Sequence, residues 1–231
     1  MIALNKKLIK DIIQWDVNNW TVPLNYWEKI LDNEKSKLTC LELGGREGGL
    51  SLWLALNGHQ VITSDLKNTE QTARPLHDKY SFDGKIIYMD IDATAIPFEN
   101  YFDLIIFKSI LGGIGYNNNK ASQQELFKQI YKALRPGGKL LYAENIRSTK
   151  LHSFFRAKFT RWGKSWRYVT INELKYFLSE FKSCEIKSTG FIGAFGVSEG
   201  QKGFLGHADK LLLNFLFPSN WKYIGYGYAV K

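Results

Sequence analysis

The chain has 231 residues, enough for one α/β domain with a substantial core, and 45% of them are hydrophobic. It contains no run of about 18 apolar residues, which excludes a helix that spans a membrane. Cys40 and Cys184 lie far apart, which excludes a disulfide framework and a cysteine metal site. The net charge of +9 suits an anionic partner such as nucleic acid, a phosphorylated compound or a membrane surface, or else a basic protein with scattered lysines.

The first residues are predicted to form a helical cap, 1–37, in two pieces. Residues 5–15 place apolar side chains on one helical face, and Pro23 is expected to start the second helix. The segment has no continuous apolar core and no small-residue cleavage site, so we expect no signal peptide and a cytoplasmic location. Three tryptophans of this cap are expected to cover an edge of the sheet: Trp15, Trp20 and Trp27.

The stretch 38–50, LTCLELGGREGGL, organises the rest of the chain. A short apolar run leads into four glycines and then into residues with helical spacing, which predicts a strand, a tight turn and a helix. Glycines at such a turn let the backbone adopt positive φ and approach a ligand, while the free N–H groups of the helix start favour a polar or anionic group. A nucleotide-like cofactor is therefore expected at this turn.

The segments after the turn alternate between strand and helix. Strands are predicted at 59–65, 84–92, 101–109 and 138–145, and helices at 69–80 and 121–134. Strands that are apolar on both faces and alternate with helices indicate a doubly wound α/β fold, with a mostly parallel sheet and helices on both faces.

The C-terminal part is predicted to close the sheet with an antiparallel last strand. A helix over 171–181, opened by Thr170, leads to a strand at 184–193, and the last strand is expected at 221–230, giving seven strands in all. Between them lies an insertion of about 193–221, with a glycine-rich stretch and an apolar helix, which we expect to act as a lid. The chain is thus interpreted as a single domain: the cap, a cofactor-binding core over 38–145 and a substrate-side half over 146–231.

The glycine turn differs from that of dinucleotide-binding proteins. Those proteins favour G-x-G-x-x-G, whereas this turn reads Gly44-Gly45-Arg46-Glu47-Gly48-Gly49, with Arg46 in place of the second glycine. Glu42, just before the turn, would repel a pyrophosphate but can bind the ammonium of a zwitterionic amino acid. A cofactor that carries an amino acid is favoured.

At this point most of residues 38–145 resembles the class I S-adenosylmethionine-dependent methyltransferases. Their acid-x-Gly-x-Gly-x-Gly motif matches this chain except at Arg46. The resemblance implies S-adenosyl-L-methionine as the cofactor and no metal. It also implies that the first turn binds the cofactor through Glu42, Gly44, Gly45, Arg46 and Gly48.

Further matches follow in the family's order. Asp65, followed by Leu66, matches the acid that accepts from both ribose hydroxyls. The run DATAIPFENYFDLIIF implies that Asp92 accepts from the adenine amino group, with the backbone N–H of Ala93 beside it and Asp90 as a competitor. The segment ALRPGGKLL is the fourth match, and Lys108, after the fourth strand, is expected near the cofactor.

Methyl transfer from a sulfonium is an in-line displacement, so alignment supplies much of the rate. A base is needed only for a poorly ionised hydroxyl or a protonated amine. Glu144 is expected near the methyl group, and His152 and His207 are candidate bases because they lie in regions that cover the substrate in this family. His59 and His77 are expected to be ordinary surface residues.

Three hypotheses for the acceptor remain open. The first is a small-molecule or glycan-precursor acceptor, with oxygen favoured over amino nitrogen because FKSILGG replaces the NPPY-like tetrad of many amino-group methyltransferases. The second is RNA, bound by the basic aromatic segment 147–167. The third is a cofactor-binding protein without catalysis, which the Arg46 substitution suggests. The cations of that segment are Arg147, Lys150, Arg156, Lys158, Arg161, Lys164 and Arg167.

Two apolar stretches can each be interpreted in more than one way. In the basic aromatic segment, Phe154, Phe155, Phe159 and Trp162 have helical spacing, and we expect an amphipathic helix docked on the core. In the insertion, KLLLNFLF is expected to be a buried lid helix, although it would also suit peripheral contact with a membrane.

Overall fold

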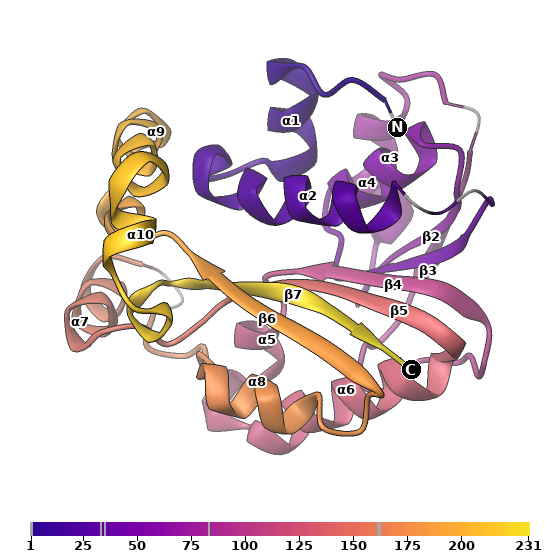
Figure 1. The fold of residues 1–231 in the computed structure, drawn as a ribbon. Helices are drawn as coiled ribbons and strands as arrows, with labels where there is room; N and C mark the ends of the chain where they lie inside the picture. The colour runs from indigo at the N-terminus through magenta and orange to yellow at the C-terminus, as the bar shows by residue number, and fades with distance from the viewer. Residues whose placement is uncertain (1, 33, 35, 83, 161–162) are drawn as a thin grey trace.

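The computed structural model describes residues 2–32, 34, 36–82, 84–160 and 163–231. They form a seven-stranded sheet in the order β3-β2-β1-β4-β5-β7-β6 (Figure 1). The first five strands in the chain are parallel, and β7 is antiparallel to both of its neighbours. The predicted doubly wound sheet with an antiparallel last strand is confirmed. The strands are β1 Thr39–Leu43, β2 Gln60–Asp65, β3 Lys85–Asp90, β4 Phe102–Lys108, β5 Leu134–Asn145, β6 Ser183–Thr189 and β7 Ile224–Val230.

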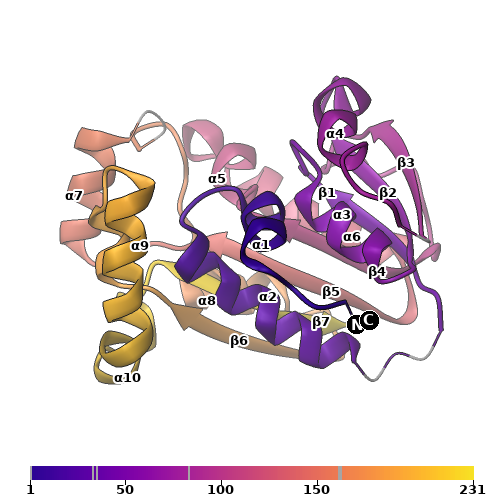
Figure 2. The same cartoon turned by 90° about the horizontal axis from the view of Figure 1, so that it is seen from above.

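Helices cover both faces of the sheet. One face carries α1 Lys6–Ile13, α2 Val17–Leu31, α3 Gly49–Leu56 and α4 Thr69–His77, and the other carries α5 Leu111–Ile114, α6 Lys120–Ala133 and α8 Ile171–Phe177 (Figures 1 and 2).

The buried hydrophobic side chains divide between these two faces. In β4, Leu104 and Ile106 belong to the cluster that contains Trp53 of α3, whereas Ile105 and Phe107 belong to the cluster under α6. This alternation is why the strands read as continuous apolar runs.

The second helix differs from its prediction, because it begins at Val17 and Pro23 lies inside it. A proline inside a helix removes a hydrogen bond and clashes with the preceding turn, at a cost of about 3 kcal/mol. Burial overrides that cost, since the helix face towards the sheet is packed at helical spacing and each buried large side chain contributes about 1.5–3 kcal/mol. The buried residues on that face are Trp20, Leu24, Trp27 and Leu31.

The C-terminal half adds shorter helices at one end of the molecule (Figures 1 and 2). They are α7 Lys150–Phe159, the 3-10 turn η2 Ile192–Phe195, α9 Glu199–Ala208, the π-helical turn η3 Asp209–Leu213, α10 Asn214–Leu216 and the 3-10 turn η4 Ser219–Trp221. The cap predicted at Thr170 is confirmed, although α8 ends at Phe177. The glycine-rich stretch contains most of α9, because a capping box between Ser198 and Gln201 starts a helix there.

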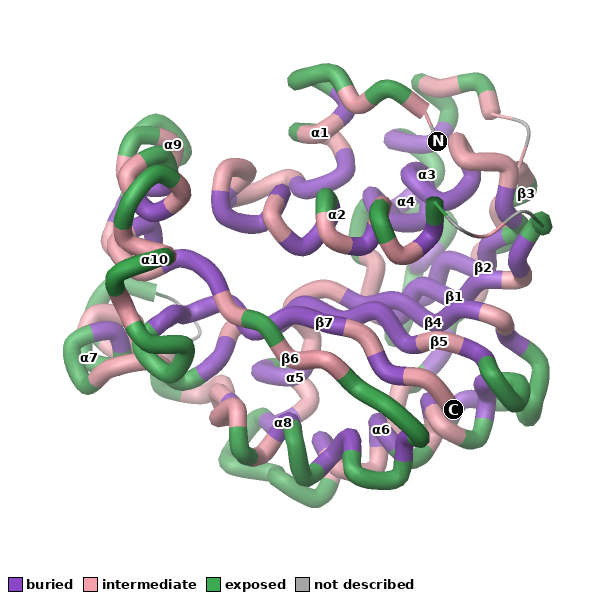
Figure 3. Tube along the Cα trace, in the orientation of Figure 1, coloured by how far each residue is buried: buried purple, intermediate pink, exposed green. Residues whose placement is uncertain are grey.

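Two predictions of buried amphipathic helices are wrong. Leu211 and Phe215 of the insertion are 79% and 83% exposed, and the outer side of α9 and α10 is largely exposed (Figure 3). In α7, Phe154 and Phe159 are exposed, and the helix packs against the body through Phe155, whose ring lies 5.1 Å from that of Phe195, and through the buried His152. The helices at this end are short and lie beside the sheet, so one layer cannot cover both of their faces. Arg161 and Trp162 lie outside the described residues.

Candidate active site

The glycine turn connects β1 to α3 at the carboxyl edge of the sheet, where the strand order reverses between β1 and β4. Gly44 and Gly48 have φ of 62° and 70°. Arg46, which replaces the family's middle glycine, has φ of 50°, so the backbone keeps the left-handed conformation that a glycine would adopt freely. Its guanidinium lies 5.6 Å from the ring centre of Trp15. The substitution therefore changes the side chain above the turn and leaves the turn intact.

Glu42 is buried beneath this turn. Its carboxylate accepts hydrogen bonds from the backbone N–H of Ser51, at 2.9 Å, and from the Ser51 hydroxyl. A Cβ at Gly45 would lie only 2.8 Å from the carboxyl carbon, so glycine is required there. Burial raises the pKa of Glu42, opposed by these hydrogen bonds. The carboxylate thus orders the start of α3 and supports the backbone of the turn.

Asp65 lies at the end of β2, across from the turn. Its carboxylate accepts from the backbone N–H of Arg46 at 3.1 Å and from that of Leu66 at 2.7 Å. Both contacts are exposed, and each carboxylate oxygen keeps a free lone pair. This geometry joins the two segments for which the sequence predicts cofactor binding.

The two acids after β3 have different surroundings. Asp90 accepts from the backbone N–H groups of Asn68 and Thr69, at 3.1 and 2.9 Å, which caps the start of α4 and lowers the pKa of Asp90. Asp92 is exposed, beside the half-buried Ala93, and accepts from Thr94. The capping contacts occupy Asp90, so the geometry favours Asp92 for the predicted adenine contact.

Lys108 connects the core to the N-terminal cap. Its ammonium donates to the carbonyl of Ile13 at 2.7 Å and lies 3.2 Å from the ring centre of Trp15. Burial lowers the pKa of Lys108 to about 7, and the nearby Glu42 opposes this shift. The ammonium is thus already engaged by the cap, and its predicted contact with the cofactor stays a prediction.

A cavity of about 470 Å³ opens beside the glycine turn, at the carboxyl ends of β4 and β5. This volume is in the range of small-molecule sites. The cap, the core and the substrate-side half all contribute to its wall. The lining includes Trp15, Asp16, Trp20, Arg46, Ser109, Asn145, Phe159, Arg156, Trp166, Tyr168, Val197, Lys202 and Tyr223.

The buried acid in this wall is Asp16, in the turn between α1 and α2. The Tyr223 hydroxyl donates to its carboxylate, and its own backbone N–H donates to Glu199 at 2.8 Å. Burial raises the pKa of Asp16 to about 6, whereas the hydrogen bond from Tyr223 and the charge of Lys202 lower it. A carboxyl group with this pKa is able to accept a proton near neutral pH.

A buried cation in the cavity wall is Arg156 of α7. Its guanidinium donates to the carbonyl of Ile146 at 2.9 Å and lies 4.2 Å from the ring centre of Tyr168. Burial lowers the pKa of Arg156, although an arginine remains charged. The wall therefore combines a fixed positive charge with aromatic surface.

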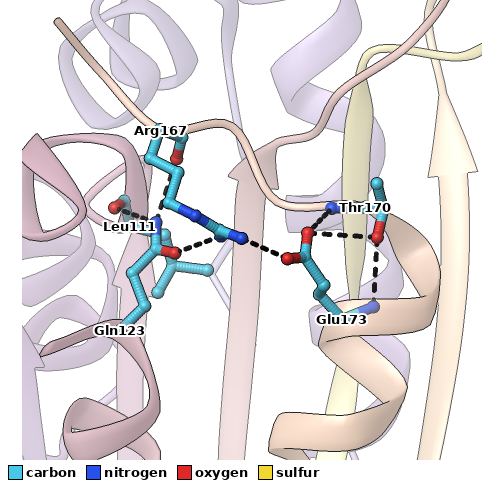
Figure 4. Close-up of polar contacts among 5 residues, drawn as sticks. All are labelled: Leu111, Gln123, Arg167, Thr170 and Glu173. Atoms are coloured by element: carbon cyan, nitrogen blue, oxygen red, sulfur yellow. Dashed lines mark hydrogen bonds and ion pairs between the residues drawn. The ribbon is translucent and has the colours of Figure 1, made fainter. Parts of the chain in front are cut away.

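A hydrogen-bond network holds the loop that carries Trp166 and Tyr168 (Figure 4). Gln123 donates to the carbonyls of Leu111 and Arg167, at 2.7 and 2.9 Å. The Arg167 guanidinium donates to Gln123 at 2.6 Å and pairs with Glu173, which itself accepts from Thr170. Arg167 is thus neutralised inside the protein, which removes it from the cations predicted to bind phosphates.

The candidate catalytic residues from the sequence, Glu144 and the two candidate bases His152 and His207, are not among the described residues that line the cavity. Glu144 is buried and accepts from the backbone N–H of Leu111 and of Asn145, at 2.6 and 2.7 Å. His152 is buried, with Nε2 2.7 Å from the Phe191 carbonyl and Nδ1 2.7 Å from the Thr149 hydroxyl. The exposed His207 is on α9. No described lining residue is one of these three, and their catalytic roles stay predictions.

The other two histidines are not surface residues, contrary to expectation. His77 is buried, with Nε2 2.8 Å from the carbonyl of Gly48 and Nδ1 2.9 Å from the Tyr88 hydroxyl. His59 is buried and its Nδ1 accepts from the N–H of Leu38. Both connect neighbouring segments, and His77 supports the glycine turn from below.

Sequence reasoning missed Asp16 and Tyr223. They are 207 residues apart and belong to no motif. The only available signal was an acid directly after Trp15, at the end of a predicted helix.

Among the described residues, no group of three or more His, Cys, Asp and Glu side chains is placed to hold a metal ion. The described helices include none that is long and apolar enough to cross a membrane.

Comparison with known proteins gives the class of this domain. Residues 41–142 match the family model described as "Methyltransferase domain". The chain thus contains a methyltransferase domain of the class I, S-adenosylmethionine-dependent type that the motifs predict.

A curated relative is the tRNA 5-carboxymethoxyuridine methyltransferase of Escherichia coli (strain K12), 28% identical over 131 residues. The match covers 53% of this chain and 46% of the relative, so the chain spans about half the length of the curated relatives it matches.

Similar solved structures share the fold. Phosphoethanolamine N-methyltransferase 2 of Haemonchus contortus, in complex with phosphomonomethylethanolamine and S-adenosylhomocysteine, superposes with a TM-score of 0.63 at 20% identity, over 92% of this chain and 52% of that one. The N-methyltransferase NodS of Bradyrhizobium japonicum, in complex with S-adenosyl-L-homocysteine, gives a TM-score of 0.59 at 14% identity, over 92% and 86% of the two chains.

Proposed function

We propose that this protein transfers the methyl group of S-adenosyl-L-methionine to a small acceptor that carries an anionic group and a hydroxyl or carboxylate oxygen, such as a glycan precursor. The cavity beside the glycine turn carries the proposal, because Asp16 and Arg156 face it from different elements. An acceptor oxygen would attack the sulfonium methyl carbon, the carbon–sulfur bond would break, and the cofactor would leave as a neutral thioether. All three parts of the chain line this cavity, in keeping with the proposal that they form one domain.

Asp16 is the group best placed to remove the acceptor's proton. It lines the cavity, whereas both ring nitrogens of His152 are engaged by other groups. The Tyr223 hydroxyl holds the carboxylate in one orientation, and Lys202 in the same wall favours its charged form. A positioned base of this kind contributes about 100-fold or more when the acceptor is a poorly ionised hydroxyl.

The cations in the wall favour an anionic acceptor. Arg156 is fixed by the Ile146 carbonyl and the Tyr168 ring, and Arg46 and Lys202 also line the cavity. A guanidinium binds carboxylate and phosphate groups through paired hydrogen bonds. The aromatic residues around it would cover the apolar part of the acceptor.

The first test separates cofactor binding from transfer. Isothermal titration with S-adenosyl-L-methionine should show binding, and NADH should show none. Methyl transfer from radiolabelled cofactor is then measured with sugar phosphates, hydroxy acids and amines of similar size. Transfer to amines alone would contradict the oxygen acceptor, and cofactor binding without transfer to any acceptor class would favour the non-catalytic alternative.

RNA methylation is the second candidate function. It is favoured by the 28% identity with the E. coli enzyme, whose name states a tRNA substrate, and by four exposed cations around α7. These cations are Arg147, Lys150, Lys158 and Lys164. RNA binding should weaken steeply with salt, roughly in proportion to the number of phosphates contacted. Transfer to total tRNA that exceeds transfer to every small acceptor would select this candidate.

A further inference from the structure

Large hydrophobic residues with exposed side chains occur on α7, α9, η3, α10 and η4 and just before α9. These elements lie at one end of the molecule (Figure 1), and much of their backbone trace belongs to exposed residues (Figure 3). Soluble monomers rarely expose large contiguous apolar patches, and those that occur often mark interaction sites. We call this set the apolar end. Its residues are Leu151, Phe154, Phe159, Val197, Phe204, Leu211, Leu212, Phe215, Leu216 and Trp221.

Three large exposed side chains of the apolar end follow one another along α9, η3 and α10. Phe204, Leu211 and Phe215 are spaced by seven and four residues, and they are 78%, 79% and 83% exposed. Their exposure places all three on the solvent-facing side of the run formed by α9, η3 and α10. The other side holds the insertion to the body, where the buried Asp209 accepts from the backbone N–H groups of Ile192 and Gly193. The insertion is therefore an amphipathic segment fixed to the protein by its polar side.

The surroundings of the apolar end are positively charged. Between Glu144 and Glu173 the sequence contains no acidic residue. Within the described part of the chain, no ion pair joins the exposed cations of this stretch to an acid. On the insertion, Asp209 is buried and Glu199 pairs with Lys202. The exposed cations are Arg147, Lys150, Lys158 and Lys164.

The apolar end continues into the candidate active site. Phe159 and Val197 line the cavity and are also 56% and 78% exposed. Trp221 stacks on Phe217, with ring centres 5.6 Å apart, and is itself partly exposed. Tryptophan at the border between apolar and polar surface is typical of proteins that contact a lipid interface.

From this arrangement we propose that the apolar end docks on a membrane surface that carries anionic phospholipids. Exposed leucines and phenylalanines would enter the interface between headgroups and acyl chains, and the cations around α7 would pair with lipid phosphates and carboxylates. RNA would use the cations but leave the leucines of the insertion, which cannot stack on bases, exposed to water. The cavity then opens towards the membrane, where an amphipathic anionic acceptor would be met.

Docking is measured without cofactor or acceptor, so its outcome is independent of the proposed methyl transfer. The full chain is sedimented with vesicles of phosphatidylcholine containing about one third phosphatidylserine. The comparison samples are pure phosphatidylcholine vesicles and the protein alone. We expect sedimentation with the anionic vesicles, weaker sedimentation with neutral ones and none without vesicles.

Substitutions separate the apolar from the charged contribution. Leu211→Ser with Phe215→Ser should lower vesicle affinity about tenfold or more. The control is Tyr176→Ser, which changes a large residue on α8 that is 56% exposed and lies outside the apolar end. Lys150→Ala and Lys158→Ala should each lower affinity about fivefold at low salt. All of these side chains are exposed, so circular dichroism and the melting temperature should stay unchanged.

The matched charge control is Lys79→Ala with Lys128→Ala, which removes two exposed lysines from other parts of the surface. Equal vesicle binding by the Leu211/Phe215 variant and the wild type would overturn the proposal. So would binding to a mixed RNA pool in the absence of vesicle binding. Light scattering that reports a dimer that dissociates in the Leu211/Phe215 variant would also overturn it, and would assign the apolar end to a second copy of the chain.

Discussion

The hydroxyl of Tyr223, just before β7, donates a hydrogen bond to the carboxylate of Asp16, in the turn between α1 and α2. The contact joins the two ends of a chain of 231 residues inside the wall of the cavity. Asn19 and the backbone of Gly193 are fixed nearby through Asp209. The N-terminal cap and the insertion are thus held in place by one buried polar cluster.

The first prediction concerns the pH dependence of turnover. A base must be deprotonated, so the rate should rise with pH through about 6, the pKa to which burial raises Asp16, and then level off. Asp16→Asn should lower kcat about 100-fold or more with a hydroxyl acceptor and remove this rise. Steady-state kinetics from pH 5 to 8 measure both effects.

Asp11→Asn is the matched control for that substitution. Asp11 of α1 also accepts from a tyrosine, Tyr80, but is not a described lining residue of the cavity. This variant should keep both the turnover and the pH profile of the wild type. An unchanged profile in Asp16→Asn would contradict the assignment of the base.

The second prediction separates cofactor contacts from structural ones. Asp65→Ala should weaken binding of S-adenosyl-L-methionine about 10- to 100-fold, because hydrogen bonds to a charged group contribute about 1.5–3 kcal/mol each. Its present partners, the N–H groups of Arg46 and Leu66, are exposed and can bond to water, so stability should change little. Calorimetry and thermal unfolding measure the two quantities.

Asp90→Ala should show the opposite pattern. It removes the contacts to Asn68 and Thr69 that cap α4, so the melting temperature should fall while cofactor affinity is kept. If Asp90→Ala lowered the affinity for the cofactor as strongly as Asp65→Ala, Asp90 would replace Asp92 as the predicted adenine contact.

The fold was largely predictable because its signals are local. Each apolar strand and each amphipathic helix of the core is encoded within about ten residues, and their alternation implies the order of a doubly wound sheet. Pro23 was misleading because tertiary burial of Trp20 and Trp27 outweighs a local helix breaker. The exposed insertion was also missed, since an apolar helical pattern reads the same whether the protein covers it or leaves it for a partner.

The site was predictable only where a motif keeps its residues together in sequence. The glycine turn, Asp65 and Asp92 follow from such motifs, and the structure brings the turn and Asp65 into contact. Asp16 and Arg156 follow from none, because their position in the cavity depends on the packing of the cap and α7. No local sequence pattern encodes the proximity of residues that are so far apart in the chain.

The third prediction tests the glycine turn. Gly48 has φ of 70°, and a Cβ there would lie 2.6 Å from Nε2 of the buried His77. Gly48→Ala should therefore destabilise the protein by about 2 kcal/mol and weaken binding of the cofactor. Gly137 has φ of 79° with open space around it, so Gly137→Ala should cost only about 1 kcal/mol and leave binding unchanged. Denaturant unfolding of the two variants would contradict this account if their stabilities were equal.

The last prediction concerns stability and the buried Glu144. Burial raises the pKa of Glu144 to about 7 from 4.5, so the folded state holds the proton more tightly than the unfolded state does. The stabilising effect of the proton is fully present below about pH 4.5 and is lost as the pH rises through 7. A shift of this size corresponds to about 3 kcal/mol, since one pKa unit is worth about 1.4 kcal/mol.

Glu144→Gln removes the titration of this one carboxyl group and leaves the other groups that titrate between pH 5 and 8 in place. Between pH 5 and pH 8 the variant should lose about 2.5 kcal/mol less stability than the wild type, measured by urea unfolding at both pH values. In wild type, one carboxyl oxygen of Glu144 accepts from the N–H of Leu111 and the other from the N–H of Asn145. The amide nitrogen of a glutamine accepts no hydrogen bond, so one of these N–H groups would lose its partner and the variant should be less stable at pH 5. Parallel pH dependences for the variant and the wild type would mean that Glu144 stays charged in the folded protein, held by those two N–H groups.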